Sequence, residues 1–258
     1  MKKILGIIVL IFLFGNNAYA NNGYLLEDNL FTNCDILTKK DPSSFGKISF
    51  VEEKRIKWWD RRKEKVNAWE QSYFNAFVFK ATFEKGHEIK IRVNSEFKNK
   101  GEAEKQALKF VLMIGQLPNF LRNKNLRTIT IHKGNHDWGG GNYDILIHTG
   151  SKHGECDEEV IMHESGHTSL DWDWGGSVNS SHWKKAAKAD SKFISEYAKQ
   201  YPDGEDVAET INWWIAVRCK PDKLSYSTYK KIVEGIPNRL RYLDEQSYDT
   251  YPLECNQN

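Results

Sequence analysis

After residue 20, the chain of 258 residues contains no apolar run long enough to cross a bilayer, which takes about 20 apolar residues. It also contains no internal repeat, no low-complexity tract and no linker rich in proline and glycine. These absences argue against a helical membrane protein, a repeat protein and a set of domains joined by flexible linkers. We expect one packed domain with at most a small appendage.

The chain has no excess of charge of either sign. It contains 37 Lys and Arg against 35 Asp and Glu, and removing Lys2 and Lys3 with a signal peptide would bring the net charge to zero. Proteins that bind nucleic acids or anionic membranes generally need a basic excess. We therefore expect no nucleic-acid partner and no stable membrane insertion. The run from Lys54 to Lys65 is locally basic, but its interleaved acids are typical of a solvated face.

The first twenty residues have the pattern of a secretory signal peptide. A positively charged start is followed by an apolar run from Ile4 to Phe14 and by small residues in Ala18-Tyr19-Ala20. No cysteine follows closely enough to carry a lipid anchor. We expect a secreted protein, extracellular or periplasmic, whose mature chain begins near Asn21.

Cysteines are few and widely spaced. The four are Cys34, Cys156, Cys219 and Cys255. Their spacing argues against a cysteine-ligated zinc site, in which ligands occur in closely spaced pairs. An even number in an exported chain predicts two disulfides instead. Three pairings are possible, and the sequence does not choose among them.

The most specific chemical signal is the segment His163-Glu164-Ser165-Gly166-His167. On a helix, side chains four positions apart lie on one face, so both imidazoles can reach the same ion. Zinc favours nitrogen ligands at this spacing, and the intervening glutamate can take a proton from water held by the metal. We predict a helix starting near Asp157, with His163 and His167 as zinc ligands and Glu164 as general base.

A catalytic zinc site usually has three protein ligands and one open position. The first candidate for the third ligand is Glu205, near the start of a helix expected from Gly204 to Arg218. Glu205 and Glu209 are also four positions apart. One carboxylate can therefore bind the metal while the other orients a ligand histidine from the outer shell.

The second candidate is Asp173, six residues after His167. Some zinc proteases take their third ligand at this offset, through a tight turn that favours glycine. This chain has Leu170 at the position of that glycine, and leucine resists a positive φ angle. Asp173 is therefore the alternative third ligand, and Asp171 is expected in a structural or outer-shell role.

The pairing of His-Glu-Ser-Gly-His with the later segment from Glu205 to Glu209 resembles the zincin metallopeptidases of the gluzincin type. The nearest likeness is to the catalytic domains of anthrax lethal factor and the Pro-Pro endopeptidases. The motifs cover roughly residues 144 to 215. The resemblance implies that Glu205 is the third zinc ligand. It also implies a tyrosine, here Tyr197 with Tyr201 as the alternative, whose hydroxyl assists at the scissile carbonyl.

The same resemblance implies an edge strand that binds an extended peptide through its free backbone groups. The segment from Asp144 to Thr149 is expected in this role, with Ile145, Ile147 and His148 along the substrate.

The remaining patterns predict an α+β fold with a zincin-like, twisted, mostly antiparallel-edged sheet packed on the active-site helix. Residues 1–20 are the signal peptide, 21–47 an arm and 48–258 the metallopeptidase domain, with a hairpin region at about 48–100 and a catalytic core at about 101–258. The expected strands are Phe74–Phe83 and Glu88–Val93 in a hairpin, Leu126–His132 and Asp144–Thr149. Further helices are expected at Gly101–Gly115, Ser181–Gln200 and Gly204–Arg218. Gly139-Gly140-Gly141 is expected to be a loop.

These expectations describe a secreted peptidase with one Zn²⁺ per chain and a peptide or protein substrate. Two alternatives remain. One is a secreted binding module with a structural zinc, which the clustered tryptophans suggest, although core packing also explains them. The other is a zincin-like protein without activity, against which Glu164 argues. Substrate specificity and oligomeric state are not predicted.

Overall fold

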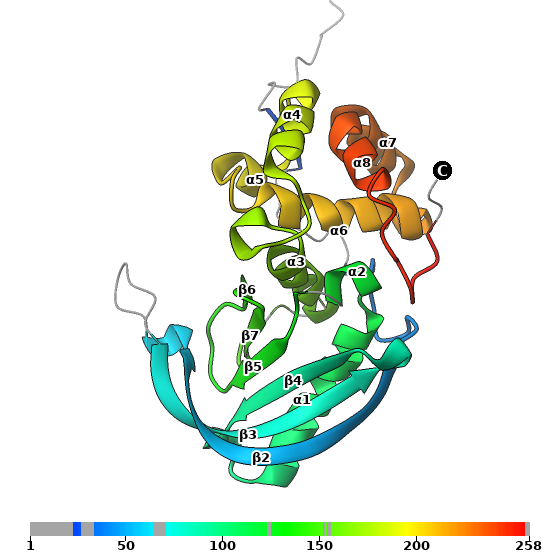
Figure 1. Cartoon of the computed structure of the whole chain (residues 1–258). Coiled ribbons are helices and arrows are strands. Elements are labelled where there is room, and N and C mark those ends of the chain that lie inside the picture. Colours follow the sequence, from blue (N-terminus) through cyan, green and yellow to red (C-terminus); the bar gives the residue numbers. More distant parts are fainter. Residues whose placement is uncertain are drawn as a thin grey trace, which may run out of the picture.

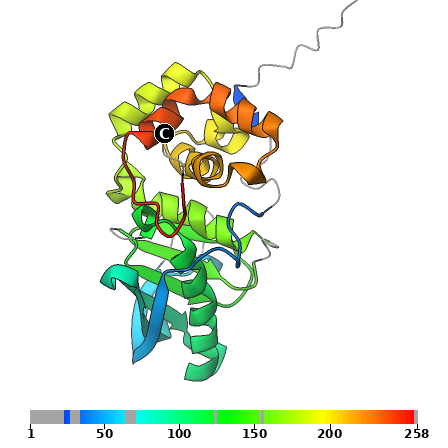
Figure 2. The same cartoon turned by 90° about the vertical axis from the view of Figure 1, so that its right-hand side faces the viewer.

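The computed structural model describes residues 23–26, 34–63, 71–122, 125–151, 153 and 156–255. A mixed sheet with one long helix forms one half of the molecule, and a group of helices forms the other (Figure 1). A view from the side shows the helical half stacked on the sheet half (Figure 2). The expected signal peptide, residues 1–20, and part of the expected arm lie outside the described residues.

The large sheet has six strands in the order β2-β3-β4-β5-β7-β6. Strands β2, β3 and β4 are antiparallel, β4, β5 and β7 are parallel, and β6 pairs antiparallel with β7. Together with eight α-helices in the described part of the chain, this mixed sheet confirms the expected α+β class. The strands are β2 (Phe45–Trp59), β3 (Gln71–Phe83), β4 (Glu88–Asn94), β5 (Thr128–His132), β6 (Gly139–Gly141) and β7 (Asp144–His148).

Helix α1 (Lys100–Gln116) covers one face of this sheet. Its first turn is capped by Asn99, whose side chain accepts a hydrogen bond from the backbone N–H of Glu102, which satisfies one of the free N–H groups at a helix start. Phe110 and Ile114 of α1 are fully buried in one cluster with the apolar strand residues. Burying a side chain of this size contributes about 1.5 to 3 kcal/mol. The predicted helix and the predicted hairpin of β3 and β4 are confirmed.

Strand β2 was not predicted from the sequence. Most of its side chains are exposed, so it lacks the alternation of polar and apolar residues that marks a half-buried strand. It forms because its backbone pairs with β3 from Phe45 to Trp59, and both strands are long and strongly curved (Figure 1). Of the run from Lys54 to Lys65, the charges on β2 up to Lys57 are exposed, as expected. Asp60, which follows β2, is buried, and residues 64 and 65 lie outside the described residues.

The expectation that Asp144–Thr149 forms the edge strand is wrong. Its strand, β7, lies between β5 and β6. Ile145, Ile147 and His148 are all fully buried, as is common for strands covered on both faces. The edge is β6, formed by the glycines expected to be a loop. Gly140 packs on the next helix so closely that a Cβ atom there would overlap the Glu164 carbonyl oxygen.

The segment from Ser181 to Gln200 is not one helix as expected. Helix α4 (Ser180–Asp190) ends at Ser191, which has a left-handed backbone with φ 60°. A short strand β8 (Phe193–Ser195) and helix α5 (Glu196–Gln200) follow. Strand β8 pairs in parallel with β1 (Tyr24–Leu26). The other helices are α2 (Asn119–Arg122), α3 (Asp157–Ser169), α6 (Asp206–Cys219), α7 (Tyr226–Gly235) and α8 (Pro237–Asp244).

All four cysteines form disulfides, as predicted. Cys34 pairs with Cys156 and ties the N-terminal arm to the start of α3, while Cys219 pairs with Cys255 and ties the end of α6 to the C-terminal segment. These bonds close loops with sequence separations of 122 and 36 residues, and each constrains the unfolded chain. Within the described ranges, no helix combines the length and apolar character needed to span a bilayer.

Candidate metal centre

Helices α3 and α6 bring the candidate ligands together because they pack closely. Gly166 of α3 lies against Ala208 of α6, and a Cβ atom at Gly166 would be 3.2 Å from the Ala208 Cα atom. Glycine costs about 1 kcal/mol relative to alanine inside a helix, and here it permits the close approach of the two helices. Glu205, the residue before the first turn of α6, is thereby placed beside the histidines of α3.

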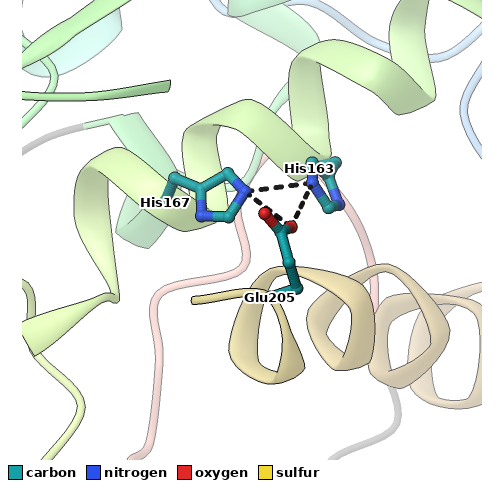
Figure 3. Close-up of side chains that lie close together, drawn as sticks. All are labelled: His163, His167 and Glu205. Atoms are coloured by element: carbon teal, nitrogen blue, oxygen red, sulfur yellow. Dashed lines mark hydrogen bonds and ion pairs between the residues drawn. The ribbon is translucent and has the colours of Figure 1, made fainter. Parts of the chain in front are cut away.

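His163, His167 and Glu205 converge on one point (Figure 3). The two histidine Nε2 atoms are 3.1 Å apart, and Glu205 Oε2 lies 3.1 Å from Nε2 of His167 and 3.4 Å from Nε2 of His163. Three ligands on a tetrahedral ion with bonds of about 2.1 Å lie about 3.4 Å from one another. The spacing of the three side chains therefore fits a metal ion bound between them.

The hydrogen bonding of the group also fits a cation. The Nδ1 atom of His167 lies 2.7 Å from Asp171 Oδ2, and a carboxylate can only accept, so Nδ1 carries a proton. When a metal displaces any proton on Nε2, the neutral ring presents its Nε2 lone pair. That lone pair faces His163 and Glu205, whose buried Oε2 atom has no hydrogen-bond partner among the described residues. Buried polar atoms are almost always satisfied, and a cation would satisfy these.

The electrostatics of the group lead to the same conclusion. Burial alone would raise the pKa of Glu205, but the adjacent His163 and His167 outweigh it and hold this pKa well below the usual range. Burial would also lower the pKa of His167, but the carboxylates of Asp171 and Glu205 raise it well above the ordinary value. The site is thus built around an ionised carboxylate and stabilises positive charge beside it.

Each histidine has an acid behind it, and of the two only His167 is hydrogen-bonded to its acid. Asp171 holds His167, and Glu209 Oε1 lies 3.4 Å from Nδ1 of His163. Such outer partners fix the ring orientation of metal ligands. Asp171 and Glu209 thus lie beside the outer ring nitrogens of the candidate ligands, and their outer-shell role stays a prediction. Asp171 lies beyond the end of α3, as the residue before a short 3₁₀ helix at Trp172–Trp174, and not on a continuation of α3.

The other expected third ligand, Asp173, is exposed in that 3₁₀ helix. Asp173 lines the same cleft as His163, His167 and Glu205, which we call the metal group, but it is not one of the three. Glu205, and not Asp173, therefore completes the group of three candidate ligands.

Tyr197 lies beside the group, with its hydroxyl 3.3 Å from Glu205 Oε1. Burial, together with the negative charge of Glu205, raises the pKa of Tyr197 to about 12. The phenol therefore keeps its proton at neutral pH and can donate a hydrogen bond. The alternative, Tyr201, is 48% exposed and packs its ring on Tyr197 at 5.1 Å between centroids.

A cleft of about 910 Å³ opens in front of the three candidate ligands, and Glu164 and Tyr197 line it with them. Its wall includes the edge strand β6 and several residues that sequence analysis did not assign to the site: Trp59, Arg61, Trp138, Leu146, Val160 and Asp203. Of these, only Trp59 belonged to a pattern noted in the sequence, the clustered tryptophans. No sequence signal joins the six to one site, because they come from segments far apart in the chain. The described residues of the arm, 23–26 and 34–47, do not line the cleft.

The chain was compared with protein-family models, with curated proteins and with solved structures, and none of them matches it. Any functional assignment therefore depends on the site itself.

Proposed function

We propose that the protein is a secreted zinc metallopeptidase with a zincin-like catalytic centre. The observation that carries this proposal is the convergence of His163, His167 and Glu205 on one point, with Glu164 and Tyr197 in the same cleft. Two imidazoles and one carboxylate, with outer acids on both rings, form the donor set that zinc hydrolases use. Zinc bound there would polarise the substrate carbonyl and acidify water.

In this proposal Glu164 is the general base. It follows the first ligand on α3, and its side chain lines the cleft. A base positioned beside the attacking water typically contributes a factor of 10² to 10⁴ in rate. Tyr197 donates its hydroxyl proton in a hydrogen bond to the developing oxyanion. Loss of one donor of this kind costs about 2.7 to 4 kcal/mol.

The substrate we propose is a peptide in extended conformation. The strand that would bind it is β6, because β6 is the edge of the sheet and lines the cleft, whereas β7 is internal. The backbone groups on the outer side of β6 would pair with those of the peptide. Gly140, packed on the backbone of α3 at Glu164, brings this edge close to the metal group.

Export of the protein is part of the proposal. Two disulfides are typical of proteins that mature in an oxidising compartment. The signal-peptide pattern of residues 1–20 agrees with that environment.

A binding module with a purely structural zinc is less well supported. Structural zinc sites normally have four protein ligands, whereas the group here offers three. Of the tryptophans that suggested a binding platform, Trp213 and Trp214 are buried in the core, and Trp59 and Trp174 line the cleft of the candidate metal site. An inactive zincin-like protein would have no need for Glu164 beside the metal.

The proposal is tested with the purified mature protein and a mixture of unfolded protein substrates. The wild type should hold about one zinc per chain and cleave peptide bonds, and a chelator should stop cleavage. Glu164→Gln should keep its zinc and lose at least 10²-fold in rate. Zinc-loaded wild type without any cleavage, or a Glu164→Gln variant as active as wild type, would contradict the proposal.

A further inference from the structure

We propose that the buried hydroxyl of Ser195 is a positioning group that holds two parts of the metal centre in place together. One part is Glu209, the acid behind His163, and the other is helix α5, which carries Tyr197. This inference rests on the proposed function in that it takes the group to bind a metal. It does not require that the protein cleave peptides.

The hydroxyl group of Ser195 donates one hydrogen bond and accepts another. Its Oγ donates to Glu209 Oε2 at 2.6 Å and accepts from the backbone N–H of Ala198 at 3.0 Å. A serine hydroxyl has a single proton, and that proton goes to Glu209 because the N–H group of Ala198 must take an acceptor. Ser195 is fully buried, so water has no access to replace either bond.

The bond to Glu209 fixes the carboxylate behind the ligand. Glu209 is 1% exposed, and its other oxygen, Oε1, faces His163 Nδ1 at 3.4 Å. Oε1 has no hydrogen-bond partner in the described part of the chain. Ser195 therefore determines which way the carboxylate turns, through a short charge-assisted hydrogen bond. Oε1 in turn faces the Nδ1 edge of His163 at ion-pair distance, without a hydrogen bond, and its charge favours the ring orientation in which Nδ1 points to it.

The bond from Ala198 caps helix α5. This helix has only five residues, and Ser195 is its N-cap. A cap satisfies a free N–H group at the helix start, and this matters for a helix of five residues, which is too short to be stable alone. Tyr197 is the second residue of α5, and its hydroxyl lies 3.3 Å from the ligand Glu205. Loss of the cap would therefore loosen the phenol relative to the metal group.

Ser195 is itself held by the first described segment of the chain. It ends strand β8, where it is the register partner of Leu26 in β1. Ile194 beside it is fully buried. The hydroxyl thus sits on a supported strand, as a positioning group needs to.

The test measures zinc affinity by competition with a chromophoric chelator. Ser195→Ala should weaken zinc binding by about 10- to 100-fold, the usual effect of removing an outer-shell partner. Ser44→Ala is the matched control, because Ser44 is also fully buried and donates to Gly115 O while accepting from Arg122, away from the metal group. The control should keep wild-type affinity. Hydrogen exchange of the α5 segment should become faster in Ser195→Ala alone.

A double-mutant cycle shows whether Ser195 acts through Glu209. In the Glu209→Gln background, Ser195→Ala should change zinc affinity by less than about 2-fold. The proposal would be overturned if Ser195→Ala weakened zinc binding as much in the Glu209→Gln background as in the wild type. It would also be overturned if the single variant Ser195→Ala had unchanged zinc affinity.

If Ser195→Ala does not fold, Ser195→Thr and Ser195→Val provide the same comparison, because they are nearly isosteric and only threonine has the hydroxyl. Threonine should bind zinc more tightly than valine by at least about 10-fold, and equal affinities would overturn the proposal. Zinc binding by the wild type without peptide cleavage would contradict the proposed function and leave this inference standing. Unchanged zinc affinity in Ser195→Ala, in a protein that cleaves peptides, would overturn this inference alone.

Discussion

Asp171 accepts a hydrogen bond from the ligand His167 across the end of helix α3, with 2.7 Å between Oδ2 and Nδ1. The carboxylate fixes the protonated nitrogen of the ring, so that Nε2 presents its lone pair to the metal position. We expect Asp171→Ala to weaken zinc binding by about 10- to 100-fold. The zinc affinity of Asp171→Asn should lie between those of Asp171→Ala and the wild type, because the asparagine amide oxygen can still accept the hydrogen bond from His167. Competition with a chelator measures this, and an Asp171→Ala variant with wild-type affinity would contradict the role.

If Glu205 and not Asp173 is the third ligand, replacing these two acids of the cleft should have opposite effects on zinc content. Glu205→Ala removes one of three ligands and should leave less than about 0.1 zinc per chain after dialysis, a loss expected when a three-ligand site becomes a two-ligand site. Asp173→Ala is the control, because Asp173 lines the cleft outside the metal group. It should keep a full zinc complement. If Glu205→Ala retained zinc and Asp173→Ala lost it, Asp173 and not Glu205 would be the third ligand.

Tyr197→Phe separates the chemical step from metal binding. The variant keeps the ring and loses only the hydroxyl near Glu205. We expect kcat to fall by about 10²- to 10³-fold, the effect of losing one oxyanion donor, with zinc content unchanged. Tyr201→Phe should have nearly wild-type kcat, because Tyr201 is largely exposed. Equal losses in the two variants would contradict the assignment of Tyr197.

The buried carboxyl group of Glu159 should make the free energy of unfolding depend on pH, and this effect does not involve the metal. Its side chain is fully buried at the start of α3 and accepts a hydrogen bond from the backbone N–H of Ile36 at 2.7 Å. Burial raises the pKa of Glu159 to about 7 from an ordinary 4.5. The folded protein thus keeps this proton at pH values where the unfolded chain has lost it. The stabilisation is present in full below about pH 4.5 and is lost as the pH rises to about 7.

Glu159→Gln should remove this dependence, since glutamine does not ionise. Relative to wild type, the free energy of unfolding of the variant should rise by up to about 3 kcal/mol between pH 4.5 and 7.5, at 1.36 kcal/mol per pKa unit. Urea unfolding across this pH range measures the difference. A difference that stays constant with pH, or falls as the pH rises, would show that Glu159 is ionised in the folded protein.

The part of the site that depends on local geometry could be predicted from the sequence. His163 and His167 are four residues apart on one helix, so their shared direction follows from the helical repeat alone. The same reasoning predicted α1 and the hairpin of β3 and β4, in which apolar residues recur with the period of the element. It also predicted two disulfides, because an even number of cysteines in an exported chain favours pairing.

Other features arise from contacts between distant segments. The pairing of Cys34 with Cys156, the edge position of β6 and the bond from Ser195 to Glu209 all join residues whose separation in the chain gives no signal. Three glycines have poor strand propensity, and they form a strand because β7 pairs with them while α3 leaves no space for a side chain at Gly140.

The amino-acid sequence alone specified an imidazole pair with a neighbouring carboxylate, because little more than one helical turn suffices to align these groups. The position of the third candidate ligand depended on the packing of two helices. Glu205 and Asp173 were both possible in sequence, and the contact of Gly166 with Ala208 brings the start of α6 to the histidines. That contact is a property of the folded chain, since helix periodicity places residues on a face but does not determine which other helix packs against that face.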